Sequence, residues 1–206
     1  MSELNTISDS KEVFYKEFPY VIPHVFRRVA DEILVELNLL SHQKNFQTNF
    51  LFSLGLRKAF NDLTFGYRPE QHINKLFEAL CISNNIDPTN ISNQAKNATQ
   101  RIDSLSTAEL NNFINTKSFK NIEIQKMFSN VSFNRLTVIG VYDLVSRVIS
   151  KDDSIEDLEI KELSTKVSTA IGFPEEKAKK DIHNYINNVE KLKQSLELIR
   201  LMNSNK

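Results

Sequence analysis

The side chains that could carry catalysis or bind a metal are few and far apart in this chain. A cysteine nucleophile needs a nearby base that lowers its pKa, and Cys81 ends an apolar helical run without such a partner in sequence. The histidines lie in different predicted helices and loops, at His24, His42, His72 and His183. No H-E-x-x-H motif, paired cysteines or glycine-rich phosphate loop occurs. The sequence therefore predicts no catalytic residue, metal or cofactor, and predicts Cys81 as a small buried side chain.

Carboxylates and arginines alternate on one predicted helix. Asp31 follows Arg27 by four residues and Glu32 follows Arg28 by four, which is the spacing of neighbours on a helix surface. Paired carboxylates can do acid–base work, but carboxylates beside arginines on an amphipathic helix are more often a solvated surface with ion pairs. The pattern favours that surface, and Arg27 and Arg28 are candidates for contact with a partner.

The segment TFGYRPE, residues 64–70, predicts a corner between two helices. Gly66 occupies the position where a left-handed residue ends a helix, and Pro69 suits the first residue of the next. Arg68 would then be the N-cap, although it cannot accept the free amide hydrogen bonds as Ser or Asp would. A structural turn is favoured over a binding turn, and Tyr67 and Arg68 are candidates for exposed contact residues.

Composition is that of a folded protein and excludes several classes of function. Hydrophobic residues make up 40% of the 206 residues and charged residues 25%, so we expect a packed core. The net charge of zero gives no long-range attraction to nucleic acid or to an anionic membrane, which leaves only local basic patches for such contacts. The first twenty residues are too charged for a signal peptide and too acidic for a transit peptide. The uncharged stretch 45–56 is too short to span a bilayer, so any membrane association is expected to be peripheral.

Apolar residues recur at helical spacing almost throughout, which predicts an all-α protein. Capping boxes are predicted at Asp9 with Glu12 and at Ser106 with Glu109. Gly55 is predicted to let a neighbouring helix approach closely. The apolar segment 135–149 contains β-branched residues, but its length and spacing favour a central buried helix over a strand. The predicted helices cover roughly residues 9–18, 23–40, 49–64, 69–81, 88–105, 107–116, 122–128, 135–149, 158–171 and 174–202.

The last predicted helix carries a heptad pattern. Ile182, Val189 and Leu196 occupy one core position, and Tyr185, Leu192 and Ile199 the other. We expect a compact helical domain over residues 1–172 and a long amphipathic helix of coiled-coil character over residues 173–206. This helix either packs along its own domain or joins another chain. Its lysines give the exposed side a basic character that suits an acidic partner or a membrane surface, but a solvated helix face is favoured. The candidates for partner contact on it are Tyr185, Lys193 and Arg200.

Five segments together resemble a known family. They are TISDSKEVFY (6–15), FRRVADEILVELNLL (26–40), LGLRKAFNDLTFGYRPE (54–70), LFEALC (76–81) and FNRLTVIGVYDL (133–144). In this order and spacing they resemble the thylakoid formation proteins, also called photosystem II biogenesis proteins, of cyanobacteria and chloroplasts. The chain departs from the family pattern at FPYVIP (18–23), where a more polar link is usual, and at Ile91 and Gln94.

The resemblance implies an all-helical, non-enzymatic accessory protein at the thylakoid membrane. It implies a role in assembly and light-stress repair of photosystem II, in partnership with membrane-bound FtsH-type proteases that supply any zinc and ATP chemistry. It points to the cyanobacterial branch and to peripheral association with the cytoplasmic side of the thylakoid membrane. The alternative is a chaperone-like or pigment-carrying module that acts directly on photosystem subunits, with a pocket among the fourteen phenylalanines.

Overall fold

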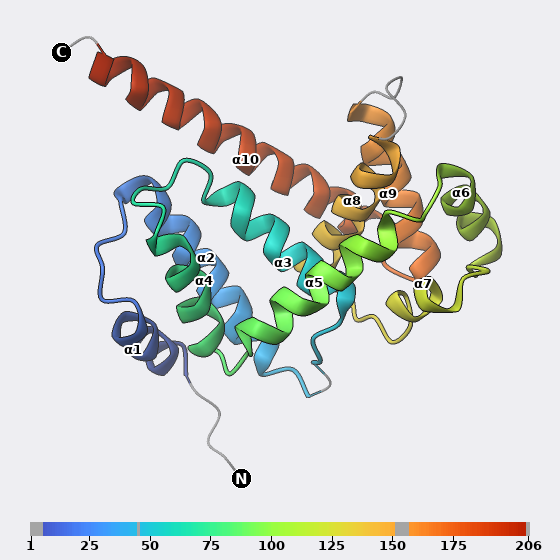
Figure 1. The fold of residues 1–206 in the computed structure, drawn as a ribbon, viewed down its shortest axis with the longest axis horizontal. Helices are drawn as coiled ribbons and strands as arrows, with labels where there is room; N and C mark the ends of the chain where they lie inside the picture. The colour runs from blue at the N-terminus through green and yellow to red at the C-terminus, as the bar shows by residue number, and fades with distance from the viewer. Residues whose placement is uncertain (1–5, 45, 151–156, 205–206) are drawn as a thin grey trace. The chain divides into compact units, whose positions relative to one another are not determined.

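The computed structural model describes residues 6–44, 46–150 and 157–204 of the chain. Within these residues the chain forms ten α-helices and no strand, which confirms the all-α prediction (Figure 1). The helices are α1 (Ile7–Glu17), α2 (His24–Ser41), α3 (Phe50–Leu63), α4 (His72–Ile82), α5 (Pro88–Ile102), α6 (Thr107–Thr116), α7 (Ile122–Met127), α8 (Arg135–Ile149), α9 (Asp157–Ile171) and α10 (Glu175–Ser204).

The helices group into two compact units that do not follow chain order. Unit 1 contains residues 1–47, 60–90 and 189–206, and unit 2 contains residues 48–59 and 91–188. The chain therefore passes from one unit to the other just before α3, inside α3, near the start of α5 and inside α10. The predicted division at residue 172 stays a prediction.

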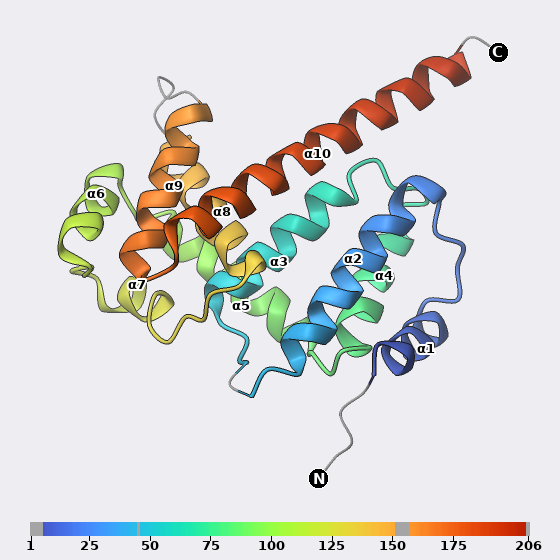
Figure 2. The ribbon, with the colours of Figure 1, turned by 180° about the vertical axis from the view of Figure 1, so that it is seen from behind.

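Unit 1 is built on mutual packing of α1, α2 and α4, which lie side by side in both ribbon views (Figure 2). Its core is aromatic and aliphatic: Phe14, Leu37 and Phe77 are at most 2% exposed. A buried hydrogen bond of 2.9 Å from Asn38 Nδ2 to Ser10 Oγ joins α2 to α1. Cys81 is also fully buried, as the sequence predicts.

Unit 2 is organised around α8, which packs against α9. Val138, Val141 and Leu144 of α8 are completely buried, which confirms the central helix predicted for this apolar segment. Ring stacking adds a second cluster, in which the centroids of Phe113 and Phe119 lie 4.3 Å apart. Arg147 is the one exposed residue of this helix, so α8 has no wide exposed polar stripe.

Helices α3 and α8 approach each other closely within unit 2. A Cβ atom placed on Gly55 would lie 1.8 Å from the carbonyl oxygen of Leu136, and one on Gly140 would lie 1.9 Å from that of Leu51. Only residues without a Cβ fit there, because backbone meets backbone. The predicted close approach at Gly55 is confirmed, and Gly140 is its partner.

Helix α1 begins one turn earlier than predicted. The Thr6 hydroxyl accepts a hydrogen bond from the Asp9 amide (3.2 Å), and the Asp9 carboxylate accepts one from the Thr6 amide (2.8 Å). The prediction of a capping box at Asp9 with Glu12 is therefore wrong, because Thr6 and Asp9 satisfy the same spacing first. The box at Ser106 and Glu109 is confirmed by the same two reciprocal hydrogen bonds.

Candidate partner-binding surfaces

The turn between α3 and α4 is built around a buried tyrosine. Gly66 has φ of 77°, as predicted for the residue that ends α3. Tyr67 is 1% exposed, and its ring lies 5.1 Å from that of Phe26 in α2. Burial raises the pKa of Tyr67, and its hydroxyl has no hydrogen-bond partner among the described residues. The prediction that Tyr67 is an exposed contact residue is therefore wrong, since its ring fills the core of unit 1.

Arg68 is exposed but does not cap a helix. Its side chain is 74% exposed and forms an ion pair with Glu70. Helix α4 begins only at His72, with Gln71 as N-cap, so the predicted helix start at Pro69 is wrong. Residues 68–71 form bends and turns before the helix begins. Arg68 stays a candidate for partner contact.

The arginines of α2 lie on its exposed side. The Arg28 guanidinium donates a 2.8 Å hydrogen bond to Glu32, four residues later, as predicted. This hydrogen bond and the charge of Glu32 raise the pKa of Arg28. Arg27 is also exposed. Both arginines are accessible to a partner and stay candidates for contact.

The first half of α10 is part of the core of unit 2. Ala178 and Ile182 are at most 2% exposed, and the Tyr185 ring is 4% exposed and lies 6.0 Å from that of Tyr142. The prediction that Tyr185 contacts a partner is therefore wrong, because its ring packs within its own unit. Lys193 and Arg200, further along α10, are exposed and stay candidates.

A cleft of about 710 Å³ lies between α9 and the start of α10. Its walls come from both helices and are joined by the turn at Gly172 and Phe173, where Gly172 has φ of 103°. Leu158 and Ile182 give it an apolar part. Its polar lining consists of Lys161, Glu162, Thr165, Lys166, Glu175, Glu176, Lys179, Lys180 and His183.

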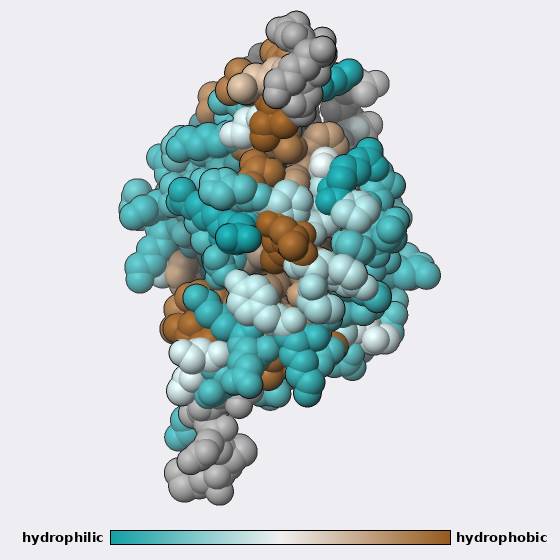
Figure 3. Space-filling model, turned by 90° about the vertical axis from the view of Figure 1, so that its left-hand side faces the viewer, coloured by the Kyte–Doolittle hydropathy of each residue, from teal (hydrophilic) through white to brown (hydrophobic). Residues whose placement is uncertain are grey.

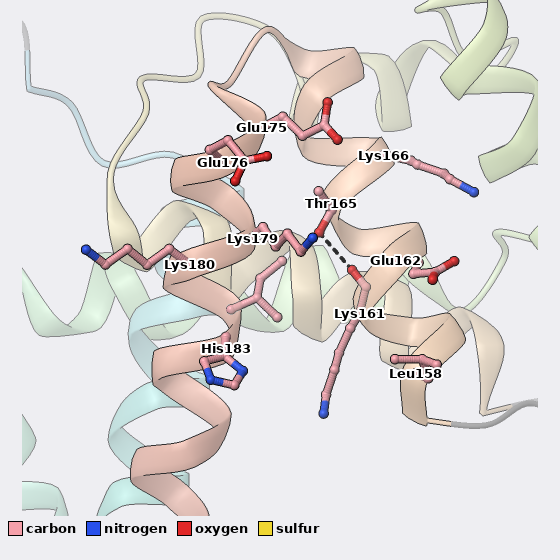
Figure 4. Close-up of a pocket in the computed structure, with 11 residues that line it drawn as sticks. Leu158, Lys161, Glu162, Thr165, Lys166, Glu175, Glu176, Lys179, Lys180 and His183 are labelled. Atoms are coloured by element: carbon pink, nitrogen blue, oxygen red, sulfur yellow. Dashed lines mark hydrogen bonds between the residues drawn. The ribbon is translucent and has the colours of Figure 1, made fainter.

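The charges of this cleft are unevenly arranged (Figure 4). Glu175 and Glu176 lie at the end nearest the turn, and Lys161 and His183 lie at the opposite end. Lys179 extends from α10 toward α9, whereas Lys166 and Lys180 extend to the outer sides. Four lysines and three glutamates line the cleft, so its charges nearly balance. The end away from Glu175 and Glu176 has ammonium donors beside an apolar part, which suits an acidic, partly apolar segment of a protein.

A partly buried carboxylate, Asp181, accompanies these lysines in the same unit. Burial raises the pKa of Asp181, against the opposing influence of Arg135, Lys180 and Lys177. The lysines of α10 are visible in the sequence as a basic side of the last helix. Those of α9 are visible when Leu158, Lys161 and Thr165 are placed on one helical face and Glu162 and Lys166 on the row beside it.

These surfaces offer charged and apolar groups for binding. No group of three His, Cys, Asp or Glu residues that could hold a metal ion occurs in the part of the chain that the structure describes. Within the same residues, none of the helices is long and apolar enough to cross a membrane. His42 and His183 contact neighbours on their own helices, Asn38 and Asn187. The class defined by fold and surfaces is an all-α protein with a charged cleft and exposed basic side chains.

Comparison with known proteins gives the family. The family model described as thylakoid formation protein matches residues 6–206, and the chain belongs to this family. The family is named for thylakoid formation and is not a known enzyme family. The predicted resemblance is thereby confirmed, together with a general role in thylakoid biogenesis.

Curated relatives cover nearly the whole chain. The chain is 43% identical over 202 residues to protein Thf1 of Prochlorococcus marinus strain NATL1A, covering 98% of both chains. It is 38% identical over 203 residues to protein Thf1 of Prochlorococcus marinus subsp. pastoris strain CCMP1986, covering 97% of this chain and 94% of the relative. A solved structure described as Psb29 superposes with a TM-score of 0.83 at 24% identity, covering 98% of this chain and 96% of that one, which shows the same fold.

Proposed function

We propose that the protein is a non-enzymatic accessory factor for photosystem II biogenesis and repair that binds or stabilises FtsH-type protease complexes. It acts by offering a surface, peripherally, on the cytoplasmic side of the thylakoid membrane. The observation that carries the proposal is the family match over residues 6–206. The cleft between α9 and α10 supports it, because its ammonium groups and apolar floor suit an acidic segment of a protein partner.

The test is co-purification from thylakoid membranes with point variants of the cleft. Truncation before α10 is unsuitable, since it would remove Ala178 and Ile182 from the core of unit 2. We would place a tag at the N-terminus, solubilise membranes gently under high light, and compare the natural chain with the double variant Lys161→Glu, Lys179→Glu. The matched control is Lys96→Glu, a charge reversal at an exposed position of α5 in the same unit.

We expect the natural chain and the Lys96→Glu control to recover FtsH-type protease, and the cleft variant to recover several-fold less. Equal recovery by all three would exclude the cleft as the contact. Failure of the natural chain to recover protease would refute the proposed partnership. Recovery of photosystem subunits or stoichiometric pigment without protease would favour the chaperone-like alternative instead.

A further inference from the structure

The last two turns of α10 expose a run of large apolar side chains. Leu198 is 62% exposed, Ile199 45%, Leu201 51% and Met202 71%, and only Arg200 interrupts them. Earlier on the same helix, heptad positions are covered: Leu192 is 6% exposed. The heptad pattern does not account for this run, because Leu198, Leu201 and Met202 lie outside its two core positions.

Helical geometry places these side chains on a second apolar face. With 3.6 residues per turn, Leu192, Leu196 and Ile199 share one stripe, and Leu198 with Met202 forms an adjacent stripe. Lys193, Glu197 and Arg200 occupy the remaining arc. The end of α10 is therefore apolar over a wider arc than the stripe that packs on the protein, with Lys193 and Arg200 on the side of the helix opposite Leu198 and Met202.

The turn after α3 contacts α10 within unit 1 and carries a further exposed apolar side chain. A Cβ on Gly66 would lie 3.1 Å from Leu196 Cδ1, so the turn after α3 lies against α10. Beside Gly66, Phe65 is 61% exposed. Figure 3 shows hydrophobic side chains close to the top of the view, toward the C-terminal end of α10. We call Phe65, Leu198, Ile199, Leu201 and Met202 the tip surface.

Size and charge favour a membrane surface over a second protein molecule. A stable protein interface takes about 20 to 30 residues on each side, far more than the tip surface contains. Shallow insertion at a bilayer interface needs only a few apolar side chains, with cations at headgroup level. Lys193 and Arg200 have long apolar stems that can lie along the acyl boundary while their charges stay in water. Glu197 is the acidic group on the same turns, and Glu70 pairs with the third nearby cation, Arg68.

We propose that the tip surface inserts into the interfacial region of an anionic lipid bilayer and is the membrane attachment site of this protein. The inference rests on the peripheral membrane association included in the proposed function and gives it a location. Phe65, Leu198 and Met202 enter the acyl boundary, and Arg200 and Lys193 contact anionic headgroups. Attachment by this surface is reversible, because it buries few side chains.

The experiment is co-sedimentation of the purified full chain with lipid vesicles. One set of vesicles is phosphatidylcholine alone, and the other is an equal mixture of phosphatidylcholine and phosphatidylglycerol. The test variant is Leu198→Ser with Met202→Ser. The matched control is Ile122→Ser with Leu39→Ser, which removes two side chains that are 70% and 57% exposed and lie outside both the tip surface and the cleft. All four positions are exposed, so circular dichroism should show unchanged helix content.

We expect the natural chain and the control to bind the anionic vesicles, and the tip variant to bind at least roughly tenfold more weakly. Arg200→Glu should weaken binding to anionic vesicles and leave binding to neutral vesicles unchanged, and added salt should reduce the difference. Equal loss in the test and control variants would overturn the inference. A dimer of the natural chain that the tip substitutions dissociate would also overturn it, since a second copy would then cover this surface.

The attachment site and the proposed protease partnership can be refuted independently of each other. If the natural chain binds no vesicles but still recovers protease from membranes, the attachment site is wrong and the partnership stands. If it binds vesicles through the tip surface but recovers no protease, the attachment site stands and the partnership is wrong.

Discussion

Replacing a glycine by alanine at the crossing of α3 and α8 should destabilise the protein, which is the opposite of the usual effect of this substitution in a helix. Alanine is a better helix former than glycine by about 1 kcal/mol, so Gly→Ala in an exposed helix usually stabilises a protein. At Gly55 the new methyl group would lie 1.8 Å from a backbone oxygen and 2.6 Å from the Gly140 nitrogen, whereas ordinary Cβ contacts lie between 3.4 and 4 Å. No flexible side chain can move aside, so the two helices must separate.

The expected magnitude follows from these two opposing effects. Overpacking of a core costs about 1 to 3 kcal/mol and occasionally more. A clash with backbone at the centre of unit 2 belongs at the upper end, and the gain in helix propensity offsets only part of it. We expect Gly55→Ala and Gly140→Ala each to lower the free energy of unfolding by about 2 to 3 kcal/mol, or the melting temperature by about 4 to 12 °C.

The measurement is urea unfolding of each variant, followed by far-ultraviolet circular dichroism. Asn61→Ala, at an exposed position of α3, is the control and should be neutral or slightly stabilising. The double glycine variant should cost less than the two single costs together, because helices separated by the first methyl group accommodate the second. Unfolding of either single variant at the same or higher urea concentration than the natural chain would refute the close crossing.

Three further predictions concern single side chains. Ser106→Ala should cost about 1 kcal/mol near neutral pH. Hydrogen bonds from Ser106 lower the pKa of Glu109 below its ordinary 4.5. The stabilisation by this pair is therefore present above pH 4.5 and is lost as the pH falls through the lowered pKa. A difference in unfolding free energy between the natural chain and Ser106→Ala that does not shrink in acid would contradict this. Tyr67→Phe should leave stability unchanged or raise it by up to about 1 kcal/mol, because the buried hydroxyl lacks a partner among the described residues, and a marked loss in thermal unfolding would show that the hydroxyl is bonded. Cys81 should react with a thiol reagent only after denaturation, and rapid labelling of the folded chain would contradict its complete burial.

Local features of the structure were predictable where neighbours in sequence decide them. The capping box at Ser106 and Glu109, and the left-handed backbone at Gly66, depend on hydrogen bonds and sterics within a few residues. The start of α1 was missed because two overlapping capping patterns compete there, and the pattern beginning at Thr6 prevails. Pro69 was misplaced for a related reason, since proline suits a turn as well as a first helical turn.

Burial of the candidate contact residues depends on segments that are distant in sequence. Tyr67 follows a glycine in a polar turn, and only the packing of Phe26 against it shows that its ring is in the core. Tyr185 has a heptad spacing that fits a partner chain equally well, until Tyr142 is seen to pack against it. Side-chain burial depends on all the neighbouring helices, and the hydrophobic pattern of one helix does not identify those neighbours.

By itself the sequence determined that the chain is all-α, that it lacks a catalytic motif and that it resembles the thylakoid formation proteins, because helical periodicity and ordered motifs are local properties. Gly55 could also be identified alone as a point of close approach. Only the tertiary structure paired it with Gly140, formed the cleft between α9 and α10, and left the end of α10 exposed beyond Leu192. These features depend on which helices pack against one another and where that packing ends, so the hydrophobic pattern along one helix could not predict them.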